Sequence, residues 1–265
     1  MKNQINLSSI KNTKPIPLYS SDQLYAMEQS WFAEGYDSFG LMKQAAWQMA
    51  QHIELLDEKK PLNPYSTASI YTTSRHMCQH RVSIWVGKGN NGGDGWLIAY
   101  YLQQIGWQVE VVTVGFESDD FDISDTTELS DAKKALQVAL SAHCSYRPFE
   151  SSAYDINKGI DSNLQADVYV DALFGIGLNR APTGIHQTAI STFNMLSERN
   201  NTLAIAVDIP SGLVASTGEV FDHLAVQADI TLCLIARKFG LHTKDGIDYS
   251  GEVIDIPLIP YQLND

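Results

Sequence analysis

The chain has 265 residues, of which 44% are hydrophobic, enough for one large core or two small ones. Its 18 basic and 31 acidic residues give a formal net charge of −13, and an acidic surface repels phosphate backbones and anionic lipids. We therefore expect no broad binding of nucleic acid or membranes. A local basic pocket for one phosphorylated small molecule is compatible with this charge.

The few cysteines and the absence of long apolar runs indicate a reduced, cytoplasmic protein. Cys78, Cys144 and Cys233 are odd in number and widely spaced, which argues against a disulfide framework or a structural zinc site. Residues 1–20 contain no apolar segment after their lysines, so no signal peptide is expected. No run of about 18 apolar residues is present to span a membrane.

The N-terminal part of the chain predicts an arm and then a pair of helices. Residues 1–19 indicate an extended arm, and residues 20–265 a single domain. Ser21 or Asp22 is expected to cap a first helix that Gly35 ends. A second helix is expected from Ser38 to about Leu56, with one apolar face formed by Leu41, Ala45, Met49 and Ile53. Residues 57–80 are typical of a loop.

From residue 82 onward, short apolar runs alternate with helical segments. Strands are expected at 82–86, 107–115, 167–175, 202–212, 229–236 and 251–256, and helices at 94–105, 132–142 and 186–197, with an acidic loop at 116–131 leading into the second of these. This alternation predicts an α/β, Rossmann-like three-layer sandwich with a mostly parallel central sheet, helices on both faces and the N-terminal helical pair. Ligands of such folds bind beyond the carboxyl ends of the strands, where the strand order reverses.

The segment WVGKGNNGGDGW (85–96) contains G-x-G-x-x-G, the pattern of dinucleotide-binding turns. It follows a strand and opens a helix, which is the right place for an anion. Its two asparagines and Asp94 add side-chain oxygens, which suit a hard cation, a hydroxylated ring or a carboxamide. The alternative is that Asn90 and Asn91 tolerate left-handed turn geometry and Asp94 caps the helix.

Two further loops carry polar residues at strand ends. In DALFGIGLNRAPTG (171–184), Asp171 ends a strand and Arg180 offers a cationic fork for phosphate. In AVDIPSG (206–212), Asp208 ends another strand and Ser211 lies in the following turn. Each loop by itself is also consistent with an ordinary capped turn.

These motifs lie at the same edge of one predicted sheet. Asp94, Asp171 and Asp208 should therefore converge with Asn91 and Ser211 on a crevice, an arrangement suited to acid–base chemistry or cation binding and not needed for hydride transfer. Lys238 follows a strand at that edge, where a phosphate contact and an ordinary exposed lysine are equally consistent with the sequence.

Taken together, these residues resemble the YjeF N-terminal domain family, the NAD(P)H-hydrate epimerases. The resemblance covers about residues 20–257. The segments that carry it are GKGNNGGDG (87–95), DALFGIGLNRAPTG (171–184), DIPSG (208–212) and ARKFG (236–240), with YAMEQSWFAEG and LMKQAAWQMA in the helical pair. The chain departs from the family in its longer 57–80 and 116–131 segments and in LMKQAA, where the family usually has an acidic residue and a glycine.

The resemblance implies an isomerase that interconverts the R and S epimers of hydrated NADH and NADPH and so repairs damaged cofactor. It implies a potassium ion held by Asn91, Asp171 and Ser211. The residues expected to contact the substrate are Asn90, Asn91, Gly92, Gly93, Asp94, Gly175, Ile176, Gly177, Leu178, Asn179, Arg180, Ala181, Asp208 and Lys238. We expect Asp208 to be the catalytic residue, because the cation would occupy Asp171 and Asp94 stands where it can cap a helix.

Two other functions compete with the epimerase. Some relatives keep the fold without the chemistry and act as binding modules or scaffolds, although Asp208 and both asparagines are intact here. A conventional NAD-dependent oxidoreductase is the third hypothesis. Many relatives also carry an ADP/ATP-dependent NAD(P)H-hydrate dehydratase domain, which would begin about where this sequence stops. The chain is thus expected to be a stand-alone enzyme or one half of a bifunctional one, and a homodimer is compatible with either.

Overall fold

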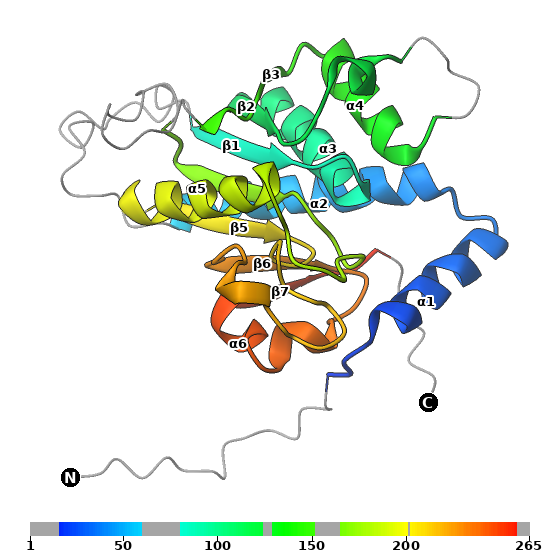
Figure 1. Ribbon diagram of the computed structural model, residues 1–265. Helices are drawn as coiled ribbons and strands as arrows, with labels where there is room; N and C mark the ends of the chain where they lie inside the picture. The colour runs from blue at the N-terminus through cyan, green and yellow to red at the C-terminus, as the bar shows by residue number, and fades with distance from the viewer. Residues whose placement is uncertain (1–15, 60–79, 124–128, 152–164, 201, 259–265) are drawn as a thin grey trace.

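A computed structural model describes residues 16–59, 80–123, 129–151, 165–200 and 202–258 (Figure 1). Within these ranges one sheet has the strand order β3-β2-β1-β4-β5-β6-β7. Its strands are β1 (Arg81–Val86), β2 (Gln108–Thr113), β3 (Ser145–Pro148), β4 (Val168–Ala172), β5 (Leu203–Val207), β6 (Ile230–Leu234) and β7 (Glu252–Ile256). Every pairing between them is parallel, and the order reverses between β1 and β4. The expected parallel α/β architecture is therefore confirmed.

Helices cover both faces of this sheet. The α-helices of the described ranges are α1 (Ser21–Ala33), α2 (Ser38–Lys59), α3 (Asn90–Gln104), α4 (Asp131–Ser141), α5 (Ile185–Asn200) and α6 (Gly246–Tyr249), and the short 3-10 helices are η3 (Ser118–Phe121), η7 (Phe221–His223) and η8 (Phe239–His242). Helices α2, α3 and α4 pack on one face, and α5 packs on the other (Figure 1). None of these helices combines the length and apolar character needed to cross a membrane.

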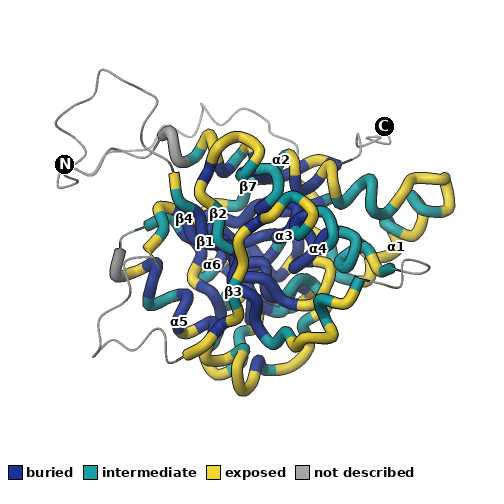
Figure 2. The backbone as a smooth tube through the Cα atoms, turned by 90° about the horizontal axis from the view of Figure 1, so that it is seen from above, coloured by how far each residue is buried: buried dark blue, intermediate teal, exposed yellow. Residues whose placement is uncertain are grey.

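Successive residues of β1 show how the sheet separates two cores. Ile84 lies in the core beneath α2, α3 and α4, whereas Trp85 lies in the core beneath α5. Trp85 meets Phe193 of α5 edge-on, with ring centroids 5.7 Å apart. A strand covered on both faces needs apolar residues at nearly every position, which explains the unbroken run VSIWV. Figure 2 shows these buried strands at the centre of the molecule.

Most expected elements are confirmed, with shifts at their ends, but the strand β3, the short helix α6 and the 3-10 helices were not expected. The cap of α1 is Ser20, whose side chain accepts a hydrogen bond from the N–H of Gln23, rather than Ser21 or Asp22. The strand β3 was not expected, because its short sequence SYRP lies largely exposed at the sheet edge and carries no apolar run. The expected arm 1–19 and loop 57–80 lie mostly outside the described residues.

Helix α3 begins at Asn90, so its expected start at Asp94 is wrong, and Gly89 occupies the N-cap. The G-x-G-x-x-G pattern of the glycine run is typical of a turn. Packing of these residues against the sheet instead favours the first turn of α3. A Cβ on Gly95 would stand 2.7 Å from the Cβ of Ala172 in β4, so α3 can lie this close to the sheet only with glycine there.

The turn between β1 and α3 packs backbone against backbone. A Cβ on Gly92 would lie 1.8 Å from the carbonyl oxygen of Gly87, and a Cβ on Gly87 would lie 2.2 Å from that of Leu173. The N–H of Gly87 also donates to the carbonyl oxygen of Ala172 at 3.2 Å. These glycines therefore serve the close approach of the β1 turn to the loop after β4.

We predict that Gly92→Ala destabilises the protein by about 1–3 kcal/mol or more, because overpacking against a backbone atom cannot be relieved by a side-chain rotation. Gly177→Ala is the matched control, since a Cβ at Gly177 meets no atom within 4 Å. Urea unfolding of both variants measures the difference. Equal free energies of unfolding would show that the turn is not tightly packed.

Candidate active site

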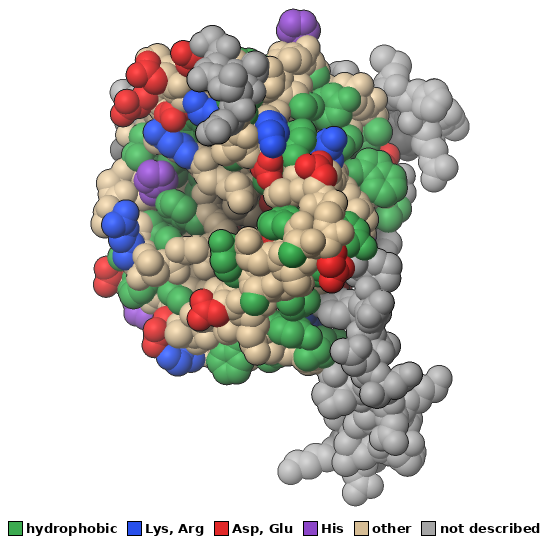
Figure 3. Space-filling model, turned by 90° about the vertical axis from the view of Figure 1, so that its right-hand side faces the viewer, with side chains coloured by type: hydrophobic (Ala, Val, Ile, Leu, Met, Phe, Trp, Pro, Cys, Tyr) green, Lys and Arg blue, Asp and Glu red, His purple; other side chains and the backbone are tan. Residues whose placement is uncertain are grey.

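Polar side chains gather at the carboxyl ends of the strands, which are called the sheet edge from here on. The segment Asn90–Asp94 follows β1, residues 173–181 follow β4, and Asp208 and Lys238 follow β5 and β6. Because the strands are parallel, these segments share one edge, at the right in Figure 1. Figure 3 faces this edge and shows a hollow near its centre with acidic side chains beside it. Asp171 lies inside β4 instead of after it.

Asn91 and Ser211 meet at the backbone of Phe174, and Asp171 joins them through Ser211. The Nδ2 of Asn91 donates to the carbonyl oxygen of Phe174 at 2.8 Å, and the Oγ of Ser211 accepts from the N–H of Phe174 at 2.8 Å. Ser211 in turn donates through its Oγ and its backbone N–H to the two carboxylate oxygens of Asp171, each at 2.7 Å. The structure thus brings together the three residues expected to hold potassium.

The surroundings of Asp171 fit a cation. Its side chain is 0% exposed, and burial raises its pKa to about 6 although Ser211 and Leu173 donate hydrogen bonds to it. No lysine or arginine of the described ranges forms an ion pair with it. A buried carboxylate is costly without a positive partner, and neutral and charged oxygens together suit hard cations such as potassium.

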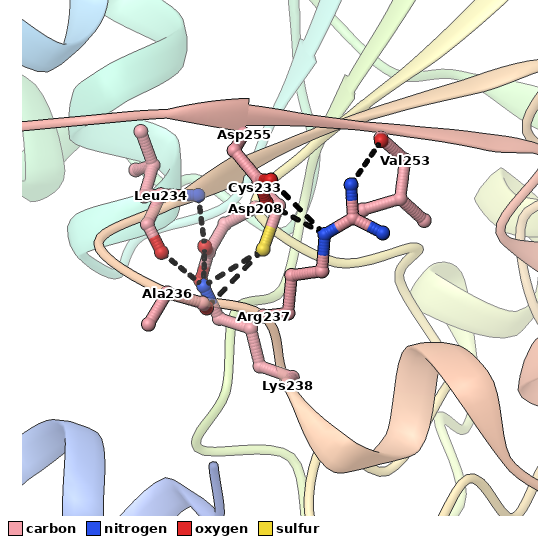
Figure 4. Close-up of polar contacts among 8 residues, drawn as sticks. All are labelled: Asp208, Cys233, Leu234, Ala236, Arg237, Lys238, Val253 and Asp255. Atoms are coloured by element: carbon pink, nitrogen blue, oxygen red, sulfur yellow. Dashed lines mark hydrogen bonds and ion pairs between the residues drawn. The ribbon is translucent and has the colours of Figure 1, made fainter. Parts of the chain in front are cut away.

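The second cluster is an ion pair between Asp208 and Lys238 (Figure 4). Besides the Oδ1 of Asp208, the Nζ of Lys238 contacts the carbonyl oxygen of Leu234 at 2.6 Å and the Sγ of Cys233 at 3.6 Å. Burial, the largest single influence, lowers the pKa of Lys238, but Asp208 and Cys233 together outweigh it, so the pKa lies above its ordinary value. Lys238 is 1% exposed, so the interpretation as an ordinary exposed lysine is wrong. An ammonium group has three donors, and all three have partners other than the expected phosphate.

The side chain of Asp208 is held at one oxygen and open at the other. Its Oδ1 also accepts the N–H of Leu234 at 2.9 Å, whereas nothing among the described residues hydrogen-bonds to its Oδ2. The side chain is 13% exposed. Asp208 has a φ of 67° and Ile235, after the next strand, has a φ of 66°. Left-handed backbone at residues other than glycine costs about 1–3 kcal/mol and concentrates at functional sites.

Glu28 of α1 joins this cluster, and the sequence analysis did not single it out. The segment before α1 is fixed to the sheet edge, because Tyr19 exchanges two backbone hydrogen bonds of 2.8 Å with residues 237–239. Burial, followed by the charge of Asp208, raises the pKa of Glu28. The available signal was its position one helical turn after the buried Leu24, because an acidic residue on a buried stripe is unusual.

Asp94 is the third carboxyl of this region and is 7% exposed within α3. Burial raises its pKa well above its ordinary value, the charges of Asp208 and Glu28 add to this effect, and Lys238 opposes it. The interpretation of Asp94 as a helix cap is wrong, because Gly89 is the N-cap. Its environment instead favours the protonated carboxyl group.

The other expected substrate contacts surround the hollow to different degrees. Gly92 and Gly93 are buried in the packed start of α3, and Gly175 lies against Asn91, whose Cβ is 3.4 Å from the position of an added Cβ. Exposed residues are Asn90, Gly177, Asn179 and Arg180, and partly exposed ones are Gly175, Ile176, Leu178 and Ala181. Arg180 is thus accessible to a ligand, in contrast to Lys238.

Comparisons with known proteins identify the family of this chain. Residues 38–240 match the family model described as YjeF-related protein N-terminus. The chain belongs to this family. It is 34% identical over 184 residues to an NAD(P)H-hydrate epimerase of Limosilactobacillus fermentum, covering 68% of this chain and 76% of the relative.

Two further comparisons extend the likeness. A bifunctional NAD(P)H-hydrate repair enzyme of Synechocystis is 31% identical over 215 residues, which are 81% of this chain and 33% of that enzyme. The crystal structure of yeast ynu0 superposes with a TM-score of 0.66 at 15% identity, covering 94% of this chain and 98% of that one. The structural likeness supports the fold, and the sequence relatives carry the family assignment.

We predict that Asp94→Asn stabilises the fold at neutral pH. Because the pKa of Asp94 is raised in the folded state, the wild type loses stability as pH rises from the ordinary aspartate range, about 4, through the raised value. Asparagine is neutral throughout, so the gain in free energy of unfolding should grow from pH 4 to pH 8. Urea unfolding across this range tests it, with Asp248→Asn on exposed α6 as the control. A gain independent of pH would show that Asp94 is not held protonated.

Proposed function

We propose that this protein is an NAD(P)H-hydrate epimerase, an isomerase that interconverts the R and S epimers of hydrated NADH and NADPH. The family assignment supports this proposal, and so do the relatives named for this activity. The observation that carries it within the molecule is Asp208, a partly exposed carboxylate whose Oδ1 accepts two hydrogen bonds and whose Oδ2 accepts none from the described residues.

The geometry is less suited to a conventional dehydrogenase. Such an enzyme uses an acidic residue near the end of the second strand to hold the ribose. Glu117 is the candidate by position, but it is the exposed N-cap of η3, where its backbone N–H donates to the Oδ2 of Asp120 at 2.8 Å. The glycine turn also places the oxygen-bearing side chains of Asn91 and Asp94 at the crevice, where a dinucleotide turn offers mainly backbone amides.

Epimerisation needs one group that takes and returns a proton. The hydrated carbon is bonded both to a hydroxyl group and to the ring nitrogen, so one of these bonds must break and form again with the opposite configuration. Loss of hydroxide needs a proton donor, and return of water needs a base. Opening of the carbon–nitrogen bond needs a base for the hydroxyl proton and later an acid. A single carboxyl group serves either route, and such catalysis contributes about 10²–10⁴-fold.

We predict that Asp208→Asn slows epimerisation at least about a hundredfold, the low end of that range. Asparagine keeps the shape of the side chain but cannot exchange a proton in this way. Chromatography of both epimers of hydrated NADH over time measures the rate, and equilibrium dialysis measures binding. Binding without epimerisation by the wild type would instead favour a scaffold, and hydride transfer from NADH would favour an oxidoreductase.

A potassium ion at Asn91, Asp171 and Ser211 is part of this proposal. The cation would neutralise the buried carboxylate of Asp171 and order the loop at Phe174 next to the substrate. Phe174 supplies the backbone groups that Asn91 and Ser211 bind, so the ion's chemistry here is electrostatic and positional. The support is the fit of the donor set and the absence of a lysine or arginine partner for Asp171 among the described residues.

We predict that KCl raises the Tm of the wild type more than tetramethylammonium chloride does at equal ionic strength, because an ion that binds only the folded state stabilises it. Asp171→Asn should abolish the difference and reduce the potassium dependence of the rate. Asp229→Asn, which removes an exposed carboxylate at the opposite edge of the sheet, is the control. Equal responses of the wild type to both salts would contradict a potassium site.

The remaining assignments follow from the same proposal. Arg180 is the candidate for phosphate binding, since it is exposed in the loop after β4. The substrate is a small molecule, and the bifunctional relatives join this domain to a second repair activity, so we infer a dehydratase, fused or separate, as the functional partner. We retain a cytoplasmic location and a homodimer as parts of the proposal. Cys144 and Cys233 are buried free thiols, in keeping with a reducing compartment.

A further inference from the structure

We propose that Lys238 holds Asp208 in the basic form, so that epimerisation starts by removal of the substrate's hydroxyl proton and proceeds by opening the carbon–nitrogen bond of the ring. This inference rests on the proposed function and adds to it a positioning residue and the identity of the bond that breaks.

The ion pair with Lys238 determines whether Asp208 first accepts or donates a proton. Its Oδ1 accepts hydrogen bonds from the Nζ of Lys238 and from the N–H of Leu234, and an oxygen with two donors acts as a fixed acceptor. Its Oδ2 is left for the substrate. A carboxylate that accepts hydrogen bonds from an ammonium group and a backbone N–H at one oxygen is unsuited to expelling hydroxide and suited to accepting a proton at the other.

Lys238 has little freedom to leave this arrangement. It is 1% exposed, and its other donors are directed at the carbonyl oxygen of Leu234 and the sulfur of Cys233 (Figure 4). Moving its ammonium group toward a phosphate at the surface would break the ion pair and leave the half-buried Asp208 with only the N–H of Leu234 as a donor, which is unfavourable. The geometry therefore assigns Lys238 to Asp208 and leaves phosphate to Arg180.

The neighbouring titratable groups do not compete as bases. Asp94 faces the pair from α3, Glu28 from α1 and Cys233 from β6, and burial raises the pKa of each of them. Groups in one site whose environments push their proton affinities apart divide the acid and base roles between them. Asp208, paired with the lysine, is the member that takes the base role.

The resulting step balances without another reactant. The Oδ2 of Asp208 takes the hydroxyl proton, and the O–H electron pair becomes the second bond of an aldehyde. The carbon–nitrogen bond breaks, and its electron pair stays on the ring nitrogen, where conjugation with the carboxamide spreads the charge. Rotation about the adjacent carbon–carbon bond presents the other face of the aldehyde. The nitrogen closes the ring again, and the oxygen recovers its proton from Asp208.

Heavy-oxygen water distinguishes the two routes on the wild-type protein. One pure epimer of hydrated NADH is incubated in H₂¹⁸O, and the other epimer is analysed by mass spectrometry after a few turnovers, with exchange in enzyme-free buffer subtracted. We expect the product to retain its original oxygen, because the carbon–oxygen bond never breaks. Incorporation of ¹⁸O at each turnover would overturn the inference. A complete lack of epimerisation would contradict the proposed function itself.

Lys238→Met tests the role of the lysine with an apolar side chain of similar length. We expect kcat to fall and the acidic limb of its pH profile to move to higher pH, because an adjacent positive charge no longer favours the carboxylate. KM should change little, whereas Arg180→Ala should raise KM. Lys244→Met, which removes an exposed ion pair with Glu219, should leave the profile unchanged.

The opposite pattern would overturn the assignment. A Lys238→Met enzyme with an unchanged pH profile and a raised, salt-dependent KM would show that the lysine binds phosphate. If Lys238→Met does not fold, Asp208→Asn combined with Lys238→Met removes both charges and should fold, because replacing a whole buried pair is tolerated better than breaking it. If the double variant also failed to fold, the broken ion pair would not explain why Lys238→Met does not fold.

Discussion

The close contact between two backbone turns is the constraint on which the site depends. Gly92 leaves room for the carbonyl oxygen of Gly87, and Gly87 leaves room for that of Leu173, so the loops after β1 and β4 touch where the strand order reverses. This contact brings the side chain of Asn91 within hydrogen-bond distance of Phe174. In a doubly wound sheet, the ligand-binding crevice opens between the two halves. Here tightly packed backbone atoms of the two loops fix its position.

Three carboxyl groups lie at this edge, and the fold treats each one differently. Asp171 has hydrogen-bond donors but no cationic side chain among the described residues, Asp208 has Lys238, and Asp94 has its pKa raised by burial. The first arrangement suits a bound cation, the second a base and the third a neutral acid. The fold thus places these three aspartates at one edge and separates them chemically by their surroundings.

The architecture could be predicted from the sequence because the strands of parallel α/β sheets have distinctive local patterns. Strands buried on both faces must be continuously apolar, as in VSIWV, and the polar residues that follow them must meet at one edge. The convergence of Asn91, Asp171 and Ser211 could therefore be predicted before their contacts were known. The short edge strand β3 gave no such signal, since only one of its neighbours is a strand and most of its residues are exposed.

The amino-acid sequence by itself determined the order of the elements, the edge that holds the site and the residue types available there. Only the tertiary structure decided that α3 starts inside the glycine run, that Lys238 points inward to Asp208 and that Glu28 of α1 joins the cluster. The physical reason is that local patterns encode periodicity and turn chemistry. Burial, ion pairing and the approach of one backbone to another depend on residues far apart in the chain, such as Asp208 and Lys238.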